Sequence, residues 1–203
     1  MLNFLANQFK KPDGIAGRIV AAIMARANLG YYKWIAQNIR FSKDDVVIEI
    51  GFGPGQGIEY LFAHAGFSRM HGVDFSGLML KQASARNRKW IVSGNLTLFH
   101  GDLINFTPQG SYTKIIGINI LYFWNDLDAY AKKLYECLKP GGTAILYFTA
   151  KEAMEKFALT KEDVFNKYSL EQLSAAFTSA GFAEVNFKEA GNIKRGYFLL
   201  AVR

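Results

Sequence analysis

The segment from Val46 to Gly57, VVIEIGFGPGQG, decides the fold, because an aliphatic run ends there in glycines at alternate positions. Residues 46–50 are typical of a strand that is covered on both faces. Glycines at its carboxyl end allow positive φ angles and let backbone N–H groups approach a bound molecule. An ionised Glu49 would be costly in a dry core, so we expect its side chain to face a cavity. Taken alone, the turn fits nucleotide binding and a tight structural turn equally well.

Length and composition predict a single domain. The chain has 203 residues, 50% of them hydrophobic, which suffices for one α/β unit with a substantial core. The single cysteine, Cys137, excludes an intramolecular disulfide, and the three histidines lack metal-binding spacing. Neither a transmembrane run nor a signal sequence is present, so we expect a soluble, cytoplasmic protein without a metal.

Positive charge is concentrated at the start of the chain. Residues 1–43 contain seven basic side chains and one acidic one, a net charge of +6, whereas the rest has 17 basic and 16 acidic side chains. This segment is suited to an anionic lipid surface, a nucleic acid or an acidic partner, and equally to a solvated helical surface. Both interpretations stay open.

Strand and helix patterns alternate along the chain. Apolar spacing predicts two amphipathic helices, divided near Asn28 to Gly30, in an N-terminal cap of residues 1–43. In the domain that follows, 44–203, the expected strands are 46–50, 70–73, 96–100, 115–120, 143–148, 183–187 and 197–202. The expected helices are 58–65, 77–92, 127–138 and one that begins at a capping box, Ser169 to Gln172.

This alternation predicts an α/β fold with a Rossmann-like, seven-stranded, mostly parallel sheet and helices on both faces. The last two expected strands are separated by a loop of about nine residues, too short for a parallel crossover, so they should form an antiparallel pair. Residues 151–168 are expected to form an insertion over the mouth of the active site.

Polar residues follow the expected strands at their carboxyl ends, where open parallel sheets bind ligands. Glu49 and the glycines follow the first strand, Asp74 the second, Asp102 the third and Asn119 the fourth. Asp74 comes 23 residues after Gly51, the spacing of an acid that accepts hydrogen bonds from ribose hydroxyls. Asp102 is placed to accept from an exocyclic amine.

In this order and spacing the segments resemble those of class I S-adenosylmethionine-dependent methyltransferases, broadly those that act on quinones and other small molecules. The matching segments are EIGFGPG at 49–55, VDFSGLML at 73–80, HGDL at 100–103, NILYFW at 119–124 and LKPGG at 138–142. The resemblance extends from about residue 46 to the C-terminus. It implies S-adenosylmethionine as the cofactor and an antiparallel pair of terminal strands.

The resemblance also implies a role for each matching position. Glu49 and the Asn119 backbone would orient the methionine amino group, and Asp74 would hold the ribose. Phe75 and Met79 would flank the adenine. The implied cofactor-binding residues are Glu49, Gly51, Phe52, Gly53, Gly55, Asp74, Phe75, Met79, Gly101, Asp102, Leu103 and Asn119. A sulfonium is already an activated electrophile, so methyl transfer needs chiefly in-line placement of the acceptor, and a base only if the nucleophile must lose a proton.

Missing motifs narrow the choice of acceptor. The fourth strand lacks the [DNS]PP[YFW] motif of amino-methylating nucleic-acid enzymes. Methylation of cytosine C5 needs a nucleophilic cysteine at a strand end, but Cys137 falls in a predicted helix. Asp126 and Asp128 are explained more simply as helix-starting acids than as metal ligands. Aromatic residues remain as pocket walls, namely Phe9, Tyr31, Tyr32, Trp34, Tyr122, Phe123, Trp124 and Phe157. We therefore expect a small apolar or aromatic acceptor, with Tyr122 or His64 as the base.

Two other functions stay open. A NAD-type oxidoreductase would share the glycine turn and Asp74, although LKPGG and the expected antiparallel end weigh against it. A non-catalytic module associated with membranes or RNA could keep the fold and use its basic N-terminal segment as the contact. The sequence leaves open the oligomeric state and whether oxygen, nitrogen or carbon is alkylated.

Overall fold

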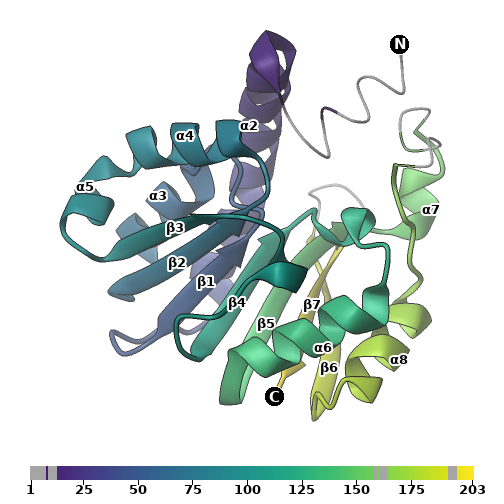
Figure 1. Ribbon diagram of the computed structural model, residues 1–203. Coiled ribbons are helices and arrows are strands. Elements are labelled where there is room, and N and C mark those ends of the chain that lie inside the picture. Colours follow the sequence, from purple (N-terminus) through teal and green to yellow (C-terminus); the bar gives the residue numbers. More distant parts are fainter. Residues whose placement is uncertain (1–7, 9–12, 158–159, 161–163, 192–195) are drawn as a thin grey trace.

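A seven-stranded sheet forms the centre of the molecule, with the strand order β3-β2-β1-β4-β5-β7-β6 (Figure 1). The computed structural model describes residues 8, 13–157, 160, 164–191 and 196–203. The strands are β1 (Val46–Ile50), β2 (Arg69–Asp74), β3 (Leu96–His100), β4 (Tyr112–Ile118), β5 (Leu138–Thr149), β6 (Glu184–Glu189) and β7 (Gly196–Val202). Strands β1 to β5 pair in parallel, and β7 runs antiparallel to both β5 and β6. The predicted sheet, including its antiparallel C-terminal pair, is confirmed.

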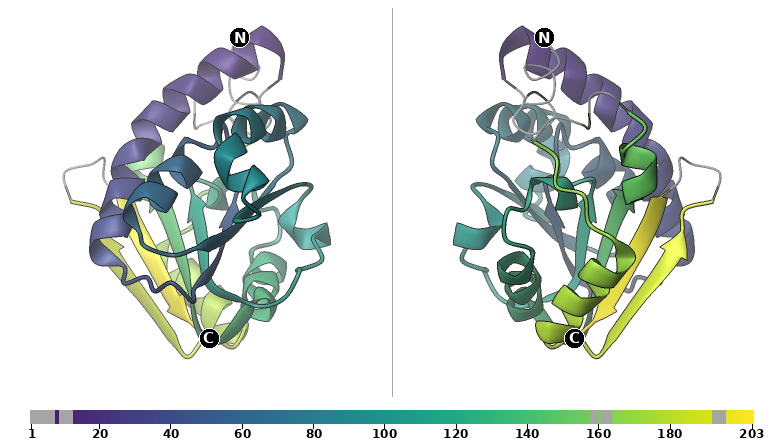
Figure 2. Two further views of the ribbon diagram at one scale, coloured as in Figure 1. Left: turned by 90° about the vertical axis from the view of Figure 1, so that its left-hand side faces the viewer. Right: turned by 90° about the vertical axis from the view of Figure 1, so that its right-hand side faces the viewer.

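Helices pack against both faces of the sheet (Figure 2). One face carries α2 (Gly14–Asn38), α3 (Gln56–His64), α4 (Gly77–Arg86) and α5 (Arg88–Val92), and the other carries α6 (Leu127–Cys137) and α8 (Leu170–Ser179). Successive residues such as Val47 and Ile48 enter opposite core clusters, because neighbouring side chains of a strand point to opposite faces. Both clusters are built from aliphatic and aromatic side chains. Among the helices of the described segments, none is both long and apolar enough to cross a bilayer.

The N-terminal region differs from the two helices that the sequence predicts. Helix α2 continues through Asn28 and Gly30 without a break. A glycine inside a helix costs only about 1 kcal/mol, and the burial of Tyr31, Tyr32 and Ile35 against the body outweighs that cost. The N-terminal half of α2 stands clear of the sheet (Figures 1 and 2).

Strands β4 and β5 differ most from the predicted boundaries. Strand β4 ends at Ile118 because Asn119 adopts a φ of 59° and turns the chain. Strand β5 begins at Leu138, so the LKPGG segment starts a strand rather than only ending a helix. Leu138 pairs with Tyr112 of β4, and the Arg203 backbone N–H donates to the carbonyl of Gly142 at 2.9 Å, which extends the pairing through this segment.

Shorter elements follow the strands near the site. They are η1 (Leu103–Asn105) after β3, η2 (Leu121–Phe123) after β4 and α7 (Lys151–Met154) after β5. The helix predicted over 77–92 is divided at Asn87 into α4 and α5. The capping box is confirmed at the start of α8, where the Ser169 and Gln172 side chains bond each other's backbone N–H groups.

Candidate active site

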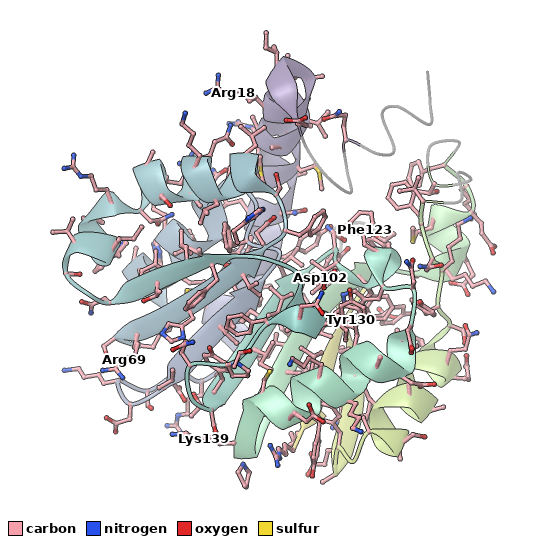
Figure 3. All side chains as sticks on the ribbon, in the orientation of Figure 1. Arg18, Arg69, Asp102, Phe123, Tyr130 and Lys139 are labelled. Atoms are coloured by element: carbon pink, nitrogen blue, oxygen red, sulfur yellow. The ribbon has the colours of Figure 1, made fainter. Side chains whose placement is uncertain are left out.

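Three adjoining cavities lie at the carboxyl ends of the central strands. The glycine cavity, of about 90 Å³, is lined by residues that include Tyr32, Gly51, Gly53, Asp74, Met79 and Asn119. The acid cavity, of about 150 Å³, is lined among others by Asp74, Phe75, Gly101, Asp102, Leu103 and Tyr130. The apolar cavity, of about 640 Å³, has walls that include Met24, Asn28, Tyr122, Thr149, Met154 and Phe157. Phe123, labelled in Figure 3, lines all three and therefore stands at their junction.

The glycine turn brings backbone groups to the first of these cavities. Gly51, Gly53 and Gly55 have φ angles of 69°, 53° and 77°, in the left-handed region that favours glycine. A Cβ on Gly51 would lie 2.6 Å from the Ile120 side chain, whereas nothing lies within 4 Å of such an atom on Gly53. The turn is therefore packed tightly at Gly51 and open to a ligand at Gly53.

Asp74, at the end of β2, is tied to this turn. Its Oδ2 accepts a hydrogen bond from the Gly53 N–H at 2.9 Å, and its Oδ1 accepts from the Ser76 N–H at 2.8 Å. Burial raises the pKa of Asp74 to about 6, although the two hydrogen bonds act in the opposite direction. Each oxygen has a second lone pair, so the carboxylate can still accept from a pair of ligand hydroxyls.

Glu49 lies behind the glycine cavity rather than in its wall. The side chain is fully buried, its Oε1 accepts a hydrogen bond from the Tyr32 hydroxyl, and its Oε2 has no hydrogen-bond partner within the described chain. Burial raises the pKa of Glu49 to about 8, with the Tyr32 hydrogen bond opposing that shift. Tyr32 itself lines the cavity. The expectation that Glu49 faces the cavity directly is therefore wrong, because α2 places Tyr32 between them.

Asp102 and Tyr130 meet at the acid cavity, as Figure 3 shows. The Tyr130 hydroxyl, from α6, donates to Asp102 Oδ1 at 2.8 Å, and the Ile104 N–H donates to the same oxygen at 3.1 Å. The Tyr130 ring stacks on Trp124 with ring centroids 4.8 Å apart. Sequence analysis missed Tyr130, because nothing in the local pattern of α6 relates it to the end of β3.

Asn119 connects α2 to the end of β4. Its Nδ2 donates to Asn28 Oδ1 at 3.0 Å, and its Oδ1 accepts from the Tyr122 hydroxyl at 2.9 Å. Its backbone N–H donates to the Tyr147 carbonyl at 2.9 Å, and the Tyr122 hydroxyl in turn accepts from the Thr149 N–H. Asn119 lines both the glycine cavity and the apolar cavity, so this network joins the two. Asn28 was also missed from the sequence.

The two predicted bases have different surroundings. Tyr122 lines the apolar cavity, but its hydroxyl is already bonded to two groups, and burial raises its pKa above the ordinary value. His64 is exposed at the end of α3, where its Nδ1 lies 2.8 Å from the Tyr60 carbonyl oxygen and its ring stacks on the Tyr60 ring. It lines none of the three cavities, so the structure does not bring His64 to the site.

Other predicted residues divide between the cavities and the core. Phe52 lines the glycine cavity, Phe75 lines the glycine and acid cavities, and Trp124 lines the acid cavity. Tyr31 stacks on Tyr147 and Trp34 on Phe198, so these two aromatic residues serve packing instead of forming pocket walls. Phe9 lies outside the described residues. Asp126 caps α6 and Cys137 is buried at the end of the same helix, where burial raises the pKa of its thiol to about 11.

Comparisons with known proteins agree with this architecture. The methyltransferase domain family matches residues 47–142. The chain is 30% identical over 171 residues to the uncharacterized methyltransferase YdaC of Bacillus subtilis (strain 168), covering 84% of this chain and 89% of YdaC.

Two solved structures illustrate the shared fold. An S-adenosylmethionine-dependent methyltransferase from Mesorhizobium loti has a TM-score of 0.69 at 16% identity, with 87% of this chain and 98% of that one covered. Haemonchus contortus phosphoethanolamine N-methyltransferase 2, solved with S-adenosyl-L-methionine, has a TM-score of 0.68 at 16% identity, with 87% and 52% covered. At these identities the likeness concerns the fold.

Proposed function

Because the chain belongs to the S-adenosylmethionine-dependent methyltransferase family, we propose that it transfers a methyl group to a small apolar or aromatic molecule held in the apolar cavity. The observation that carries this proposal is the position of that cavity. It shares four lining residues with the glycine cavity, namely Met24, Asn28, Asn119 and Phe123, so an acceptor bound there would adjoin the cofactor site. Its volume, about 640 Å³, is in the range of small-molecule sites.

The residues around the glycine and acid cavities fit S-adenosylmethionine. Asp74 supplies two acceptor oxygens for the ribose hydroxyls, beside the open backbone at Gly53. Asp102 supplies an acceptor for the adenine amine at the other end, with Leu103 beside it as an apolar wall. Glu49 lies behind the glycine cavity, and its hydrogen bond to the Tyr32 hydroxyl fixes Tyr32 in the cavity wall.

Bound S-adenosylmethionine supplies a methyl group on a sulfonium, which needs no further activation by the protein. The chain's own residues then bind the acceptor, orient it and exclude water. Phe123 stands where acceptor and cofactor sites meet, and it limits the directions from which an acceptor can approach. We assign Tyr122 a positioning role, because its hydroxyl fixes Asn119 and its raised pKa keeps the phenol protonated, which makes it a poor base near neutral pH.

Calorimetric titration with S-adenosylmethionine, S-adenosylhomocysteine and NAD tests the cofactor assignment. We expect both sulfur compounds to bind and NAD not to bind. Asp74→Ala should weaken binding by about tenfold or more, because it removes both ribose-facing oxygens. Asp44→Ala, which removes an exposed acid remote from the cavities, is the matched control. NAD binding without binding of either sulfur compound would contradict the proposal.

A transfer assay with methyl-labelled S-adenosylmethionine over cell extract tests the acceptor class. We expect the label to enter small molecules that partition into an apolar solvent. Met154→Lys, which places a charge in the wall of the apolar cavity, should reduce this transfer while cofactor affinity is retained. Label found only in RNA or protein would contradict an apolar small-molecule acceptor.

A further inference from the structure

Three isoleucines are exposed in a row on the outer face of α2. Ile15, Ile19 and Ile23 retain 78%, 58% and 64% of their accessible surface, and spacing by four residues places them on one side of the helix. Among the described residues, the other large exposed hydrophobic side chains are Val92 on α5 and Phe157 after α7, which occur singly. Single exposed apolar residues are normal, whereas a contiguous apolar stripe marks an interaction site.

Basic side chains accompany this stripe. Arg26 follows Ile19 by seven residues and Ile23 by three, which places it on the same face, and Arg18 projects beside the stripe near the free end of α2 (Figure 3). We call Ile15, Arg18, Ile19, Ile23 and Arg26 the docking face. In the described part of the chain the one salt bridge joins Arg86 to Glu59, so neither arginine of the docking face has an acidic partner there.

The opposite face of the same helix borders the apolar cavity. Met24 and Asn28 of α2 line that cavity, and so does Phe157, which is 58% exposed. The cavity therefore reaches the surface at Phe157. Figure 1 shows α7 and the free half of α2 at the same end of the molecule.

We propose that the docking face binds the surface of an anionic lipid bilayer. In such a contact the isoleucines enter the boundary between headgroups and acyl chains, and the arginines remain with the anionic headgroups. The described residues 13–43 carry a net charge of +4, five basic side chains against Asp13, which adds attraction to an anionic surface. Docking does not depend on the proposed function. If that function holds, docking would bring the protein close to a source of lipid-soluble acceptors.

Charge and side-chain type favour a bilayer over other partners. In a contact with a second copy of the chain, the arginines of one docking face would lie against those of the other and repel them. Residues 13–43 contain five basic side chains and one acidic one, Asp13, so acidic groups there could offset little of this repulsion. In a contact with RNA, three isoleucines would meet phosphates, and the docking face has no aromatic side chain on which bases could stack. An anionic bilayer suits both the apolar and the basic residues.

Sedimentation of the full chain with lipid vesicles tests the proposal. We expect binding to vesicles of phosphatidylcholine mixed with phosphatidylglycerol, weak binding to phosphatidylcholine alone, and loss of binding as salt is raised. The double substitution of Ile19→Ser with Ile23→Ser should weaken binding by about tenfold or more, because it removes apolar surface from the contact. Val92→Ser, which alters an equally exposed side chain on α5, is the matched control and should bind as the wild type does.

A second pair of variants tests the charge contribution. Arg18→Gln with Arg26→Gln should weaken binding to the anionic vesicles and reduce its salt dependence, whereas Arg88→Gln on α5 should not. Equal binding to neutral and anionic vesicles, or wild-type binding by the isoleucine variant, would overturn the proposal. The proposal would also be overturned if the isoleucine substitutions abolished dimer formation or RNA binding while vesicle binding persisted.

Cofactor titration of the same preparations separates this proposal from the proposed function. Loss of vesicle binding with unchanged S-adenosylmethionine affinity supports docking and confirms that the variants are folded. Failure of the wild type to bind S-adenosylmethionine would remove the proposed function and leave the vesicle result intact.

Discussion

Two buried carboxyl groups, Glu49 and Asp74, link the candidate site to pH. Burial raises their pKa values to about 8 and about 6, from ordinary values of 4.5 and 3.8. At intermediate pH the folded protein therefore holds protons that the unfolded chain has released. The free energy of unfolding is highest below the ordinary pKa, falls as pH rises through the interval, and levels off above the raised pKa.

Replacement of the deeper carboxyl group should reveal this dependence. Between about pH 5 and pH 8 we expect Glu49 to lower the wild-type free energy of unfolding by on the order of 3 to 5 kcal/mol. Glu49→Gln should flatten the curve by this amount, because glutamine does not titrate. Urea unfolding at several pH values measures it. Glu155→Gln, at an exposed acid, should keep the wild-type slope, and an unflattened Glu49→Gln curve would contradict the burial argument.

The bond from Tyr130 to Asp102 makes a prediction about recognition of the adenine amine. Tyr130→Phe removes the hydroxyl that holds Asp102, so binding of S-adenosylhomocysteine should weaken by about fivefold, equivalent to about 1 kcal/mol. For an analogue with oxygen in place of the adenine amine, Tyr130→Phe should weaken binding much less, because this ligand has no donor group for Asp102. Calorimetry compares the two ligands, with Tyr60→Phe as the control. Equal losses for both ligands would show that Tyr130 supports only local structure.

Helix α2 is the element that shapes the site. Its Tyr32 covers Glu49, its Asn28 holds Asn119, and its Met24 lines both the glycine cavity and the apolar cavity. Close approach to α3 makes this arrangement possible, because Gly57 leaves room for the Tyr32 ring. The residues that separate the glycine cavity from the apolar cavity thus depend on how one helix packs against the sheet.

Introducing a methyl group at that contact should disturb both stability and binding. In Gly57→Ala the new Cβ would overlap the Tyr32 ring, and overpacking of this kind costs about 1 to 3 kcal/mol. Alanine's higher helix propensity returns only about 1 kcal/mol. We expect a lower midpoint in urea unfolding and weaker cofactor binding. Gly77→Ala, where the nearest atom is an ordinary 3.8 Å from the new Cβ, should not be destabilised; equal behaviour of the two variants would contradict the packing argument.

Across the whole molecule, the candidate site draws on elements from α2 to α7, so a ligand bound there should stabilise the entire fold. The glycine cavity combines residues of α2, the loop after β1, the end of β2 and the loop after β4. None of these elements can open while a ligand bridges them. Binding and global unfolding are therefore coupled.

This coupling predicts a thermal shift. At a concentration of about 100 Kd, S-adenosylhomocysteine should add about 2.7 kcal/mol to the free energy of unfolding and raise Tm by about 5 to 10 °C. Scanning calorimetry measures the shift. Asp74→Ala, with binding weakened about tenfold, should gain only about 1.4 kcal/mol and show about half the shift at the same concentration, and NAD should give none with the wild type. A comparable shift in Asp74→Ala would place the ligand elsewhere.

Much of the fold follows from short segments. The strands at 46–50 and 96–100 were predicted with the boundaries that the structure shows, because aliphatic runs between turn residues are local signals. The left-handed glycines after β1 and the capping box at α8 are likewise properties of a few consecutive residues. The mostly parallel sheet with its antiparallel end followed from the alternation of these elements together with the short final loop, whereas the strand order is known only from the structure.

The arrangement of the site depends instead on residues far apart in the chain. The bonds from Tyr32 to Glu49, Tyr130 to Asp102 and Asn119 to Asn28 span 17, 28 and 91 residues. Local patterns also predict two helices where the structure has the single helix α2, which burial keeps continuous. They assign His64 to the site, whereas the structure places it at the exposed end of α3. Periodicity specifies which residues form a strand or a helix. Which distant side chains meet depends on how whole elements pack, because the native packing is the one that gives the best total burial and hydrogen bonding.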